Sequence, residues 1–218
     1  MLNTTFMARR LHQAMVVSFL SLSSFTIASP TFAASLDFST WETSGDVSPT
    51  LTETKLTNAF ADGSDDAVNY NLSGNDPTDI NSLETFLAIN PGNLGSDATE
   101  GSAIKTALNV LAGDIFSFDY SLLTYDTVSS DRAFVTIGNS VFSLNGSTPF
   151  SYTFATSGIY DIGIGVIDVN DVVNSSILSL TNASLTNSQS VPEPVTTFAS
   201  ILAGGVGLML KRKDSKKA

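Results

Sequence analysis

Apolar and polar side chains alternate along several short segments between residues 101 and 185, and this alternation restricts the fold more than any other feature. In the clearest segment, 115–124, every second residue is large and apolar: Phe116, Phe118, Tyr120 and Leu122. A period of two places such residues on one face of a β-strand, whereas an amphipathic helix needs a period of about 3.6. The sequence therefore predicts half-buried strands that pack against a common core.

Turn residues divide the rest of the chain into further short segments with the same alternation. Asn145 and Gly146 form a favoured two-residue hairpin turn, so the segments on either side of it are expected to pair. Asn81 is the candidate N-cap of one short helical turn that contains Leu83 and Leu87 and lies over a sheet edge. We expect further strands at residues 36–39, 104–110, 133–137, 140–144, 150–154, 159–169 and 177–185.

Many short strands with almost no helix predict an all-β fold, an antiparallel β-sandwich. Some nine to eleven strands are expected, and a jelly roll is the favoured topology. An immunoglobulin-like sandwich is the alternative. It is disfavoured because the Cys…Trp…Cys spacing typical of that fold is absent from a chain with no cysteine.

The first 33 residues have the order of segments that is typical of a secretory signal peptide. Two arginines precede an apolar segment at residues 14–27. Small residues around Ala33 and Ala34 then offer a cleavage site for signal peptidase after either alanine. We therefore expect residues 1–33 to be removed during export and residues 34–187 to form the folded ectodomain.

The C-terminal part, residues 188–218, ends in a stiff motif, an apolar segment and a basic tail. In the motif at 191–194, Pro192 and Pro194 each fix the backbone angle φ. The uncharged segment at 195–210 would form a helix of about 24 Å, shorter than the roughly 30 Å hydrocarbon core of a bilayer. Such a segment suits a transient membrane span better than a permanent anchor, which is the alternative.

The segment between the two terminal signals is strongly acidic. The whole chain has a formal net charge of −11, but seven of its ten lysines and arginines lie in the terminal segments, so residues 34–190 have a net charge near −16. Such a domain repels nucleic acid. The only histidine, His12, lies in the predicted signal peptide, and with no cysteine this excludes Ser-His-Asp and Cys-His catalysis and the usual zinc sites.

The three-part tail resembles the PEP-CTERM sorting signal of Gram-negative bacteria. The resemblance implies export to the inner membrane and processing by an exosortase, a membrane-embedded cysteine protease. Carried over by position, residues 195–210 form the membrane span and the basic tail is 211–218. The recognition motif consists of Pro192, Glu193 and Pro194. The cytoplasmic basic anchor consists of Lys211, Arg212 and Lys213.

The domain before the tail is similar to PEP-CTERM ectodomains in several short motifs. These are Trp41…Gly45-Asp46 and the segments GSAIK at 101–105, AGDIFSFDY at 112–120 and FSYTF at 150–154. The resemblance implies a galactose-binding-like jelly roll, a class associated with carbohydrate recognition. The aspartates that family members often place on the last strand are absent from the corresponding residues 174–182.

Calcium is the one cofactor that we consider for the acidic loops. It takes about six to eight oxygen ligands from carboxylates, carbonyls and water on flexible loops. The candidate sets are Asp62, Asp65 and Asp66, our first choice, then Asp76 with Asp79, and Asp168 with Asn170 and Asp171. The competing interpretation is that these residues form turns and keep the surface soluble.

Carbohydrate binding and glycoside hydrolysis are the other functions considered. Sugar rings stack on exposed aromatic side chains, for which the candidates are Trp41, Tyr70, Tyr125 and Tyr160. A sole tryptophan beside the first strand is more typical of a core residue. A pair of carboxylates can hydrolyse glycosidic bonds without histidine, but no paired spacing is found among Glu42, Glu53, Glu84 and Glu100.

These observations together predict an exported, non-enzymatic envelope protein. We expect a structural or polysaccharide-associated module of the cell surface or extracellular matrix, which passes through the inner membrane. Its partners during maturation are signal peptidase and an exosortase, and extracellular polysaccharide is the expected partner afterwards. The alternative is a carbohydrate-binding or calcium-binding adhesin, and a carboxylate-dependent glycoside hydrolase is less favoured.

Overall fold

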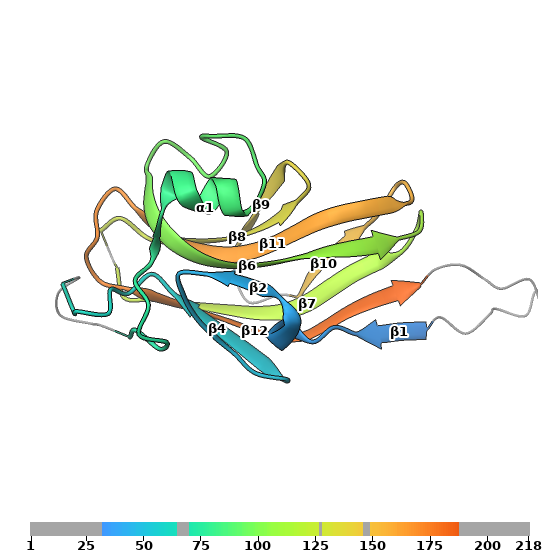
Figure 1. Ribbon diagram of the computed structural model, residues 1–218, viewed down its shortest axis with the longest axis horizontal. Helices are drawn as coiled ribbons and strands as arrows, with labels where there is room; N and C mark the ends of the chain where they lie inside the picture. The colour runs from blue at the N-terminus through green and yellow to red at the C-terminus, as the bar shows by residue number, and fades with distance from the viewer. Residues whose placement is uncertain (1–31, 65–69, 127, 146–148, 188–218) are drawn as a thin grey trace, which may run out of the picture.

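A computed structural model of the chain describes residues 32–64, 70–126, 128–145 and 149–187. Within these ranges the chain forms twelve β-strands, one α-helix and one short 3-10 helix. The strands form two antiparallel sheets that face each other (Figure 1). The prediction of an all-β sandwich is confirmed.

The first sheet has the strand order β10-β7-β12-β4-β3, with β1 paired to β12. Its strands are β1 Phe32–Ser35, β3 Asp46–Pro49, β4 Glu53–Thr57, β7 Ile115–Thr124, β10 Phe150–Thr153 and β12 Ser176–Asn187. The β12 strand lies at the centre, because it pairs with β7 on one side and with both β4 and β1 on the other.

The second sheet has the strand order β2-β6-β11-β8-β9, with β5 paired to β6. Its strands are β2 Glu42–Ser44, β5 Thr78–Asp79, β6 Ala98–Val110, β8 Arg132–Ile137, β9 Ser140–Leu144 and β11 Gly158–Val169. The long pair β6–β11 forms the middle of this sheet and sets its register: Ile104 lies opposite Ile164, so both face inward.

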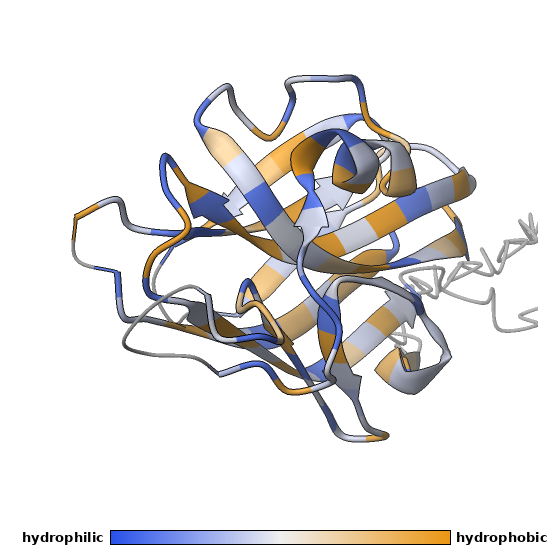
Figure 2. Ribbon diagram, turned by 60° about the vertical axis from the view of Figure 1, so that its left-hand side comes forward, coloured by the Kyte–Doolittle hydropathy of each residue, from blue (hydrophilic) through white to orange (hydrophobic). Residues whose placement is uncertain are grey.

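The main core lies between the sheets and follows the predicted alternation. Phe116 and Phe118 are fully buried, and Tyr120 lies beside them. The fully buried Leu178 and Leu180 of β12 belong to the same cluster. Burying one such side chain stabilises the fold by about 1.5–3 kcal/mol. Bands of alternating hydropathy run along the strands in Figure 2, as expected for sheets that bury one face.

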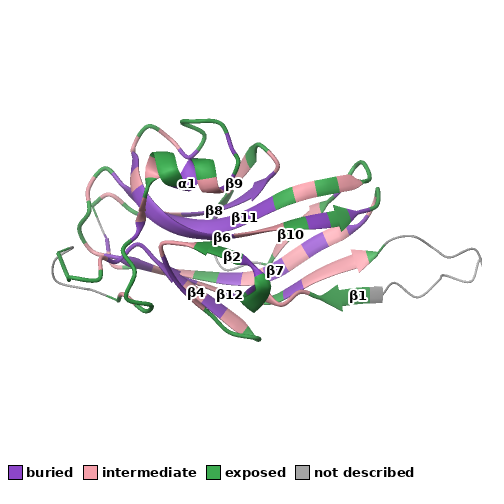
Figure 3. Cartoon of the chain, viewed as in Figure 1, coloured by how far each residue is buried: buried purple, intermediate pink, exposed green. Residues whose placement is uncertain are grey.

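The outer face of the second sheet is covered as well, by helix α1, Ile80–Phe86. Leu83 and Leu87 pack there in a second cluster with Phe134. Two glycines of β11 make this close approach possible: a Cβ at Gly163 would lie 2.4 Å from Leu87, and one at Gly165 would lie 2.6 Å from Phe134. Residues 162–169 of β11, inward-facing and outward-facing alike, are therefore all buried (Figure 3).

Three connections meet at one end of the sandwich, which we call the loop end: the described parts of residues 58–77 and 125–131, and residues 170–175. The strand register brings them together, because Thr57 at the end of β4 and Leu123 near the end of β7 both lie opposite Ile177 near the start of β12. The strand β1 and the last residues of β12 lie at the opposite end (Figure 1).

Three local predictions were wrong. Residues 36–39 were expected to form a strand, but Phe38–Thr40 is a 3-10 helix, because Asp37 caps it by accepting from the Ser39 N–H at 2.8 Å. The helix N-cap is Asp79, two residues before Asn81, and its carboxylate accepts from the Ser82 N–H. The strands around Asn145 do not form a hairpin, because β9 pairs with β8 and β10 pairs with β7 in the other sheet.

No helix in the described ranges is both long enough and apolar enough to cross a membrane. The predicted span at 195–210 lies outside those ranges.

Candidate functional site

Acidic side chains gather at the loop end, and most of them are used within their own loops. Asp62 accepts from the Ser64 N–H at 3.0 Å, and the Ser64 side chain, followed by this N–H, lowers the pKa of Asp62. Asp76 accepts from the Ala61 N–H at 2.9 Å. Asp126 accepts from the backbone N–H groups of Val128 and Ser129. These carboxylates stabilise turns, as the competing interpretation predicts.

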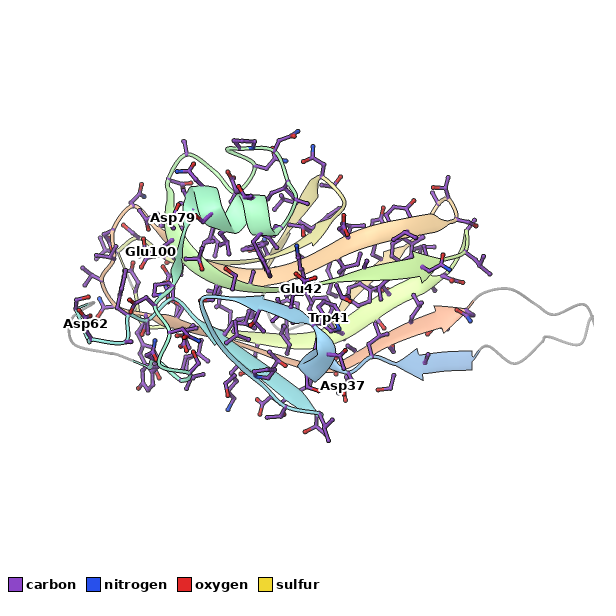
Figure 4. The ribbon with its side chains drawn as sticks, viewed as in Figure 1. Asp37, Trp41, Glu42, Asp62, Asp79 and Glu100 are labelled. Carbon is purple, nitrogen blue, oxygen red and sulfur yellow. The ribbon has the colours of Figure 1, made fainter. Side chains whose placement is uncertain are left out.

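The first predicted calcium set is not assembled by the described residues. Asp62 lies in an exposed turn, far out on its loop in Figure 4, and Asp65 and Asp66 lie outside the described residues. The second set is divided: Asp76 stays in the loop, whereas Asp79 caps α1, where the Ser82 side chain and N–H lower its pKa.

The third set is divided too, but one of its members is placed differently. Asp171 accepts from the Val173 N–H at 3.0 Å within its own loop. Asn170 adopts a left-handed backbone with φ of 67°, and its N–H donates to the Asp97 carbonyl at 2.7 Å. Asp168, by contrast, lies near the end of β11 and is only 2% exposed. Its alternation with the buried Val166 places it on the inner face, between the sheets.

A second buried aspartate, Asp131, shares a hydrogen-bond donor with Asp168, the side-chain amide of Asn58. Asn58 donates from Nδ2 to Asp131 Oδ2 at 2.8 Å and to Asp168 Oδ2 at 3.2 Å. The Asn58 amide is fixed in this orientation, because its Oδ1 accepts from the Ser176 N–H at 2.6 Å. The arrangement joins both sheets: Asn58 follows β4, Ser176 begins β12, Asp131 precedes β8 and Asp168 belongs to β11.

Burial and mutual repulsion disfavour the charged forms of these aspartates. Desolvation, and then the nearby charges of Asp131 and Glu100, raises the pKa of Asp168 to about 8. Desolvation is also the main cause that raises the pKa of Asp131 to about 6, against the opposing effects of the nearby Ser176 hydroxyl and the Asn58 amide. Glu100 of β6 is buried and lies at the same end (Figure 4). We call Asn58, Asp131 and Asp168 the aspartate pair site.

Two of these three residues were missed by the sequence analysis. Asp168 was named, but with Asn170 and Asp171; Asp131 and Asn58 were not named at all. A usable signal existed for the two aspartates. Asp168 interrupts the apolar sequence of a strand between Ile167 and Val169, and Asp131 stands directly before a buried strand. Acids in such positions are rarely buried unless they have a partner.

Two other buried carboxylates, those of Asp46 and Glu84, each accept from several donors. Asp46 accepts from the N–H groups of Leu72 and Ser73, from the Ser73 hydroxyl and from the Thr57 hydroxyl. Glu84 of α1 accepts from the N–H groups of Gly92 and Leu94 at 2.7 and 2.9 Å. These two acids fix the loops 71–75 and 87–97, so their role is structural.

The predicted sugar-stacking residues do not form a strip. Trp41 is buried and packs edge-on against Phe38 and face-on against Phe116, as a core residue. Tyr160 packs against Phe154 near the other end of β11. Only Tyr70 and Tyr125 lie together at the loop end, with ring centroids 4.9 Å apart, and they stack on each other.

A cavity of about 280 Å³ lies beside the second sheet, between the loop 93–95 and the strands β8 and β9. Its one charged side chain is Arg132, which binds Asp97 with two contacts of 2.7 Å. No acidic side chain lines this cavity. Of the glutamates considered for hydrolysis, Glu42 and Glu53 form surface ion pairs with Lys105 and Lys55.

The motif Pro192, Glu193 and Pro194 and the basic residues Lys211, Arg212 and Lys213 lie outside the described residues. Among the described residues, no group of three Asp, Glu, His or Cys side chains is arranged to hold a metal ion. No family model matches the chain, and no curated protein matches it either.

Proposed function

We propose that this chain is an exported, non-catalytic β-sandwich module, processed at a C-terminal PEP-CTERM-like signal and serving as a structural or polysaccharide-associated component of the cell surface or extracellular matrix. The observation that carries the proposal is the pairing of β1 with the end of β12, where Phe32 lies opposite Asn187. The two predicted processing segments therefore join the domain side by side, at the end opposite to the loop end (Figure 1).

Processing at this end costs the domain little. The predicted signal-peptidase sites, after Ala33 or Ala34, lie within β1. Ala33, Ala34 and Ser35 are exposed, and none belongs to a core cluster. Cleavage removes a few backbone hydrogen bonds to residues 185–187, and the described side chains that it removes, those of Ala33 and Ala34, are exposed.

The strand pairing supports a jelly-roll topology for this module. A jelly roll is obtained when a long antiparallel hairpin of four strand pairs is rolled into two sheets. The expected pairs, from the outside of the hairpin to its tip, are first with eighth, second with seventh, third with sixth and fourth with fifth. The eight main strands pair in this way: β4 with β12, β6 with β11, β7 with β10 and β8 with β9.

The distribution of carboxylates supports a binding or structural module over a hydrolase. A glycosidase needs two carboxyl groups on either side of a bound sugar. The aspartate pair site is buried between the sheets, and the cavity beside β8 and β9 has no acidic lining. For the polysaccharide-associated role, hydrogen bonding by polar side chains is a more suitable mode of contact than stacking on aromatic rings. The outer face of β7 presents such polar side chains, Ser117, Asp119 and Ser121.

The processing proposal is tested with the full-length chain carrying a C-terminal epitope tag, produced in a bacterium that has an exosortase. We expect the tag to be lost from the mature wild-type protein. The triple variant P192A/E193A/P194A should keep the tag and stay in the inner-membrane fraction. The matched control is T196A/T197A, which changes the adjacent residues and should be processed normally.

Two results would overturn the proposal. One is normal loss of the tag from the triple variant, which would leave a different processing signal or a plain anchor. The other is a wild-type protein that keeps its tag in a strain where a known exosortase substrate is cleaved. Mass spectrometry of the mature protein then locates both cleavage sites and any group on the new C-terminus.

A further inference from the structure

The aspartate pair site contains oxygen atoms that the described protein groups leave without a hydrogen bond. Asp131 and Asp168 are 5% and 2% exposed, and each uses Oδ2 to accept from the same Asn58 nitrogen. Their Oδ1 atoms are buried and have no hydrogen-bond partner among the described residues. A buried carboxylate oxygen in this condition has lost its water without compensation.

The charges at this site are not balanced by the basic residues of the domain. The described ranges contain three, Lys55, Lys105 and Arg132, and each forms an ion pair with another acid. Arg132 follows Asp131 in the sequence, but its guanidinium points away to Asp97 and to the Leu94 carbonyl. Further acids surround the pair: Glu100 raises the pKa of Asp168, and Asp126 raises that of Asp131.

We propose that the aspartate pair site binds one Ca²⁺ ion, with Asp131 and Asp168 as its two carboxylate ligands. Calcium fits the chemistry here, because it prefers hard oxygen ligands and the site has neither histidine nor cysteine. Three acidic side chains do not converge. The coordination therefore needs hydroxyl and backbone carbonyl oxygens and water, which calcium accepts readily.

Calcium binding would have a mechanical consequence for the loop end. The ligands come from different parts of the fold: Asp131 ends the loop 125–131, and Asp168 precedes the loop 170–175. Asn58, which orients both carboxylates, begins the loop 58–77. One cation between them therefore ties all three loops and joins the two sheets at this end.

A bound proton is the rival explanation for the charge balance. One proton on Asp168 removes the repulsion with Asp131 and needs no cation. The two explanations differ in what stabilises the protein: added calcium at constant pH in one, and acidification alone in the other. They also differ in specificity. Magnesium competes with a bound calcium ion and a chelator removes it, whereas a bound proton responds to neither.

The test uses the full-length chain purified in mild detergent, stripped with EGTA and dialysed at pH 7.5. We expect 2 mM CaCl2 to raise the thermal midpoint Tm by at least about 5 °C, and isothermal titration to show one site per chain. The variants D131N and D168N should each weaken calcium binding at least about tenfold. The control D62N, from the set favoured by the sequence, should bind calcium like the wild type.

Each other outcome contradicts the proposal. A Tm that does not respond to calcium but rises on acidification assigns the site to a proton. An equal response to magnesium indicates ionic screening rather than a calcium site. Loss of binding in D62N with normal binding in D168N moves the site to the outer loop. Circular dichroism of each variant at 20 °C shows whether it is folded, and a folded D168N that binds normally also overturns the proposal.

Discussion

Two buried acidic sites at the same end of the sandwich differ in the number of hydrogen-bond donors that their carboxylates have. Asp46 is fully buried, and four donors surround its carboxylate, two of them backbone N–H groups. Asp131 and Asp168 are almost as deeply buried, but a single amide nitrogen serves both. The first site is saturated with donors, whereas the second has unused oxygen atoms.

The difference shows what makes a buried charge structural or functional. Donors fixed by the backbone stabilise the carboxylate of Asp46 and define the conformation of the loop 71–75. At the aspartate pair site the donors are too few for two negative charges, so the pKa of Asp168 rises to about 8 because of desolvation and the adjacent acids. A saturated site gains nothing from a cation, while an undersaturated one can take up a cation or a proton.

The comparison predicts the largest loss of stability for Asp46→Ala. Removing the carboxylate leaves the N–H groups of Leu72 and Ser73 and the Thr57 hydroxyl without their acceptor. We expect the free energy of unfolding to fall by about 3 kcal/mol, measured by urea denaturation at pH 7.5. Ser73→Ala, which removes one of the four donors, is the control and should cost less than about 1 kcal/mol. A similar loss in both variants would contradict the idea of a saturated carboxylate.

Asp168→Asn should have the opposite sign in calcium-free buffer. The amide keeps the shape of the side chain but removes a buried charge that repels Asp131 and Glu100. We expect Tm at pH 8 to rise by about 3 °C, which corresponds to roughly 1 kcal/mol for a domain of this size. A fall in Tm measured by circular dichroism with EGTA present would show that the carboxylate is stabilised by donors after all.

The strands that the sequence predicts well are those with one buried face. Residues 115–124 were expected as a strand from Phe116, Phe118 and Tyr120, and β7 has these bounds. The burial of the other face of β11 could not be predicted from this alternation. Residues Ile162–Val169 are buried on both sides, because Leu87 after α1 lies over Gly163 and the Phe134 ring lies over Gly165. The sequence around a strand glycine does not predict which side chain will cover it.

The candidate site depends on pairings that a single sequence does not encode locally. Asn58 is 73 residues from Asp131 and 110 residues from Asp168, and only the order of β4, β12, β11 and β8 brings them together. The members of the favoured outer set, Asp62, Asp65 and Asp66, instead lie within five residues of one another. Adjacency is typical of turns, and Asp62 indeed caps a turn through the Ser64 N–H.

A change of pH gives a smaller effect of the same kind as Asp168→Asn. The folded state holds a proton on Asp168 up to about pH 8, whereas the unfolded state loses it near the ordinary value of 3.8. The contribution of this group to stability therefore decreases as pH rises between these values. In calcium-free buffer we expect Tm to rise by about 2 °C from pH 8 to pH 6, and this rise should disappear in Asp168→Asn. A wild-type Tm that falls over the same interval would mean that other groups dominate.

The smallest expected effect comes from Asp62→Ala, which removes an exposed carboxylate instead of a buried one. Asp62 lies in water, and its loss removes one cap of a turn that is not attached to either core cluster. Surface changes of this kind alter stability little, so Tm should change by less than about 1 °C, with or without calcium. If Asp62→Ala instead abolished a calcium-dependent rise in Tm, the cation would bind among the outer loop carboxylates, and the unsatisfied oxygens of Asp131 and Asp168 would then be explained by a shared proton.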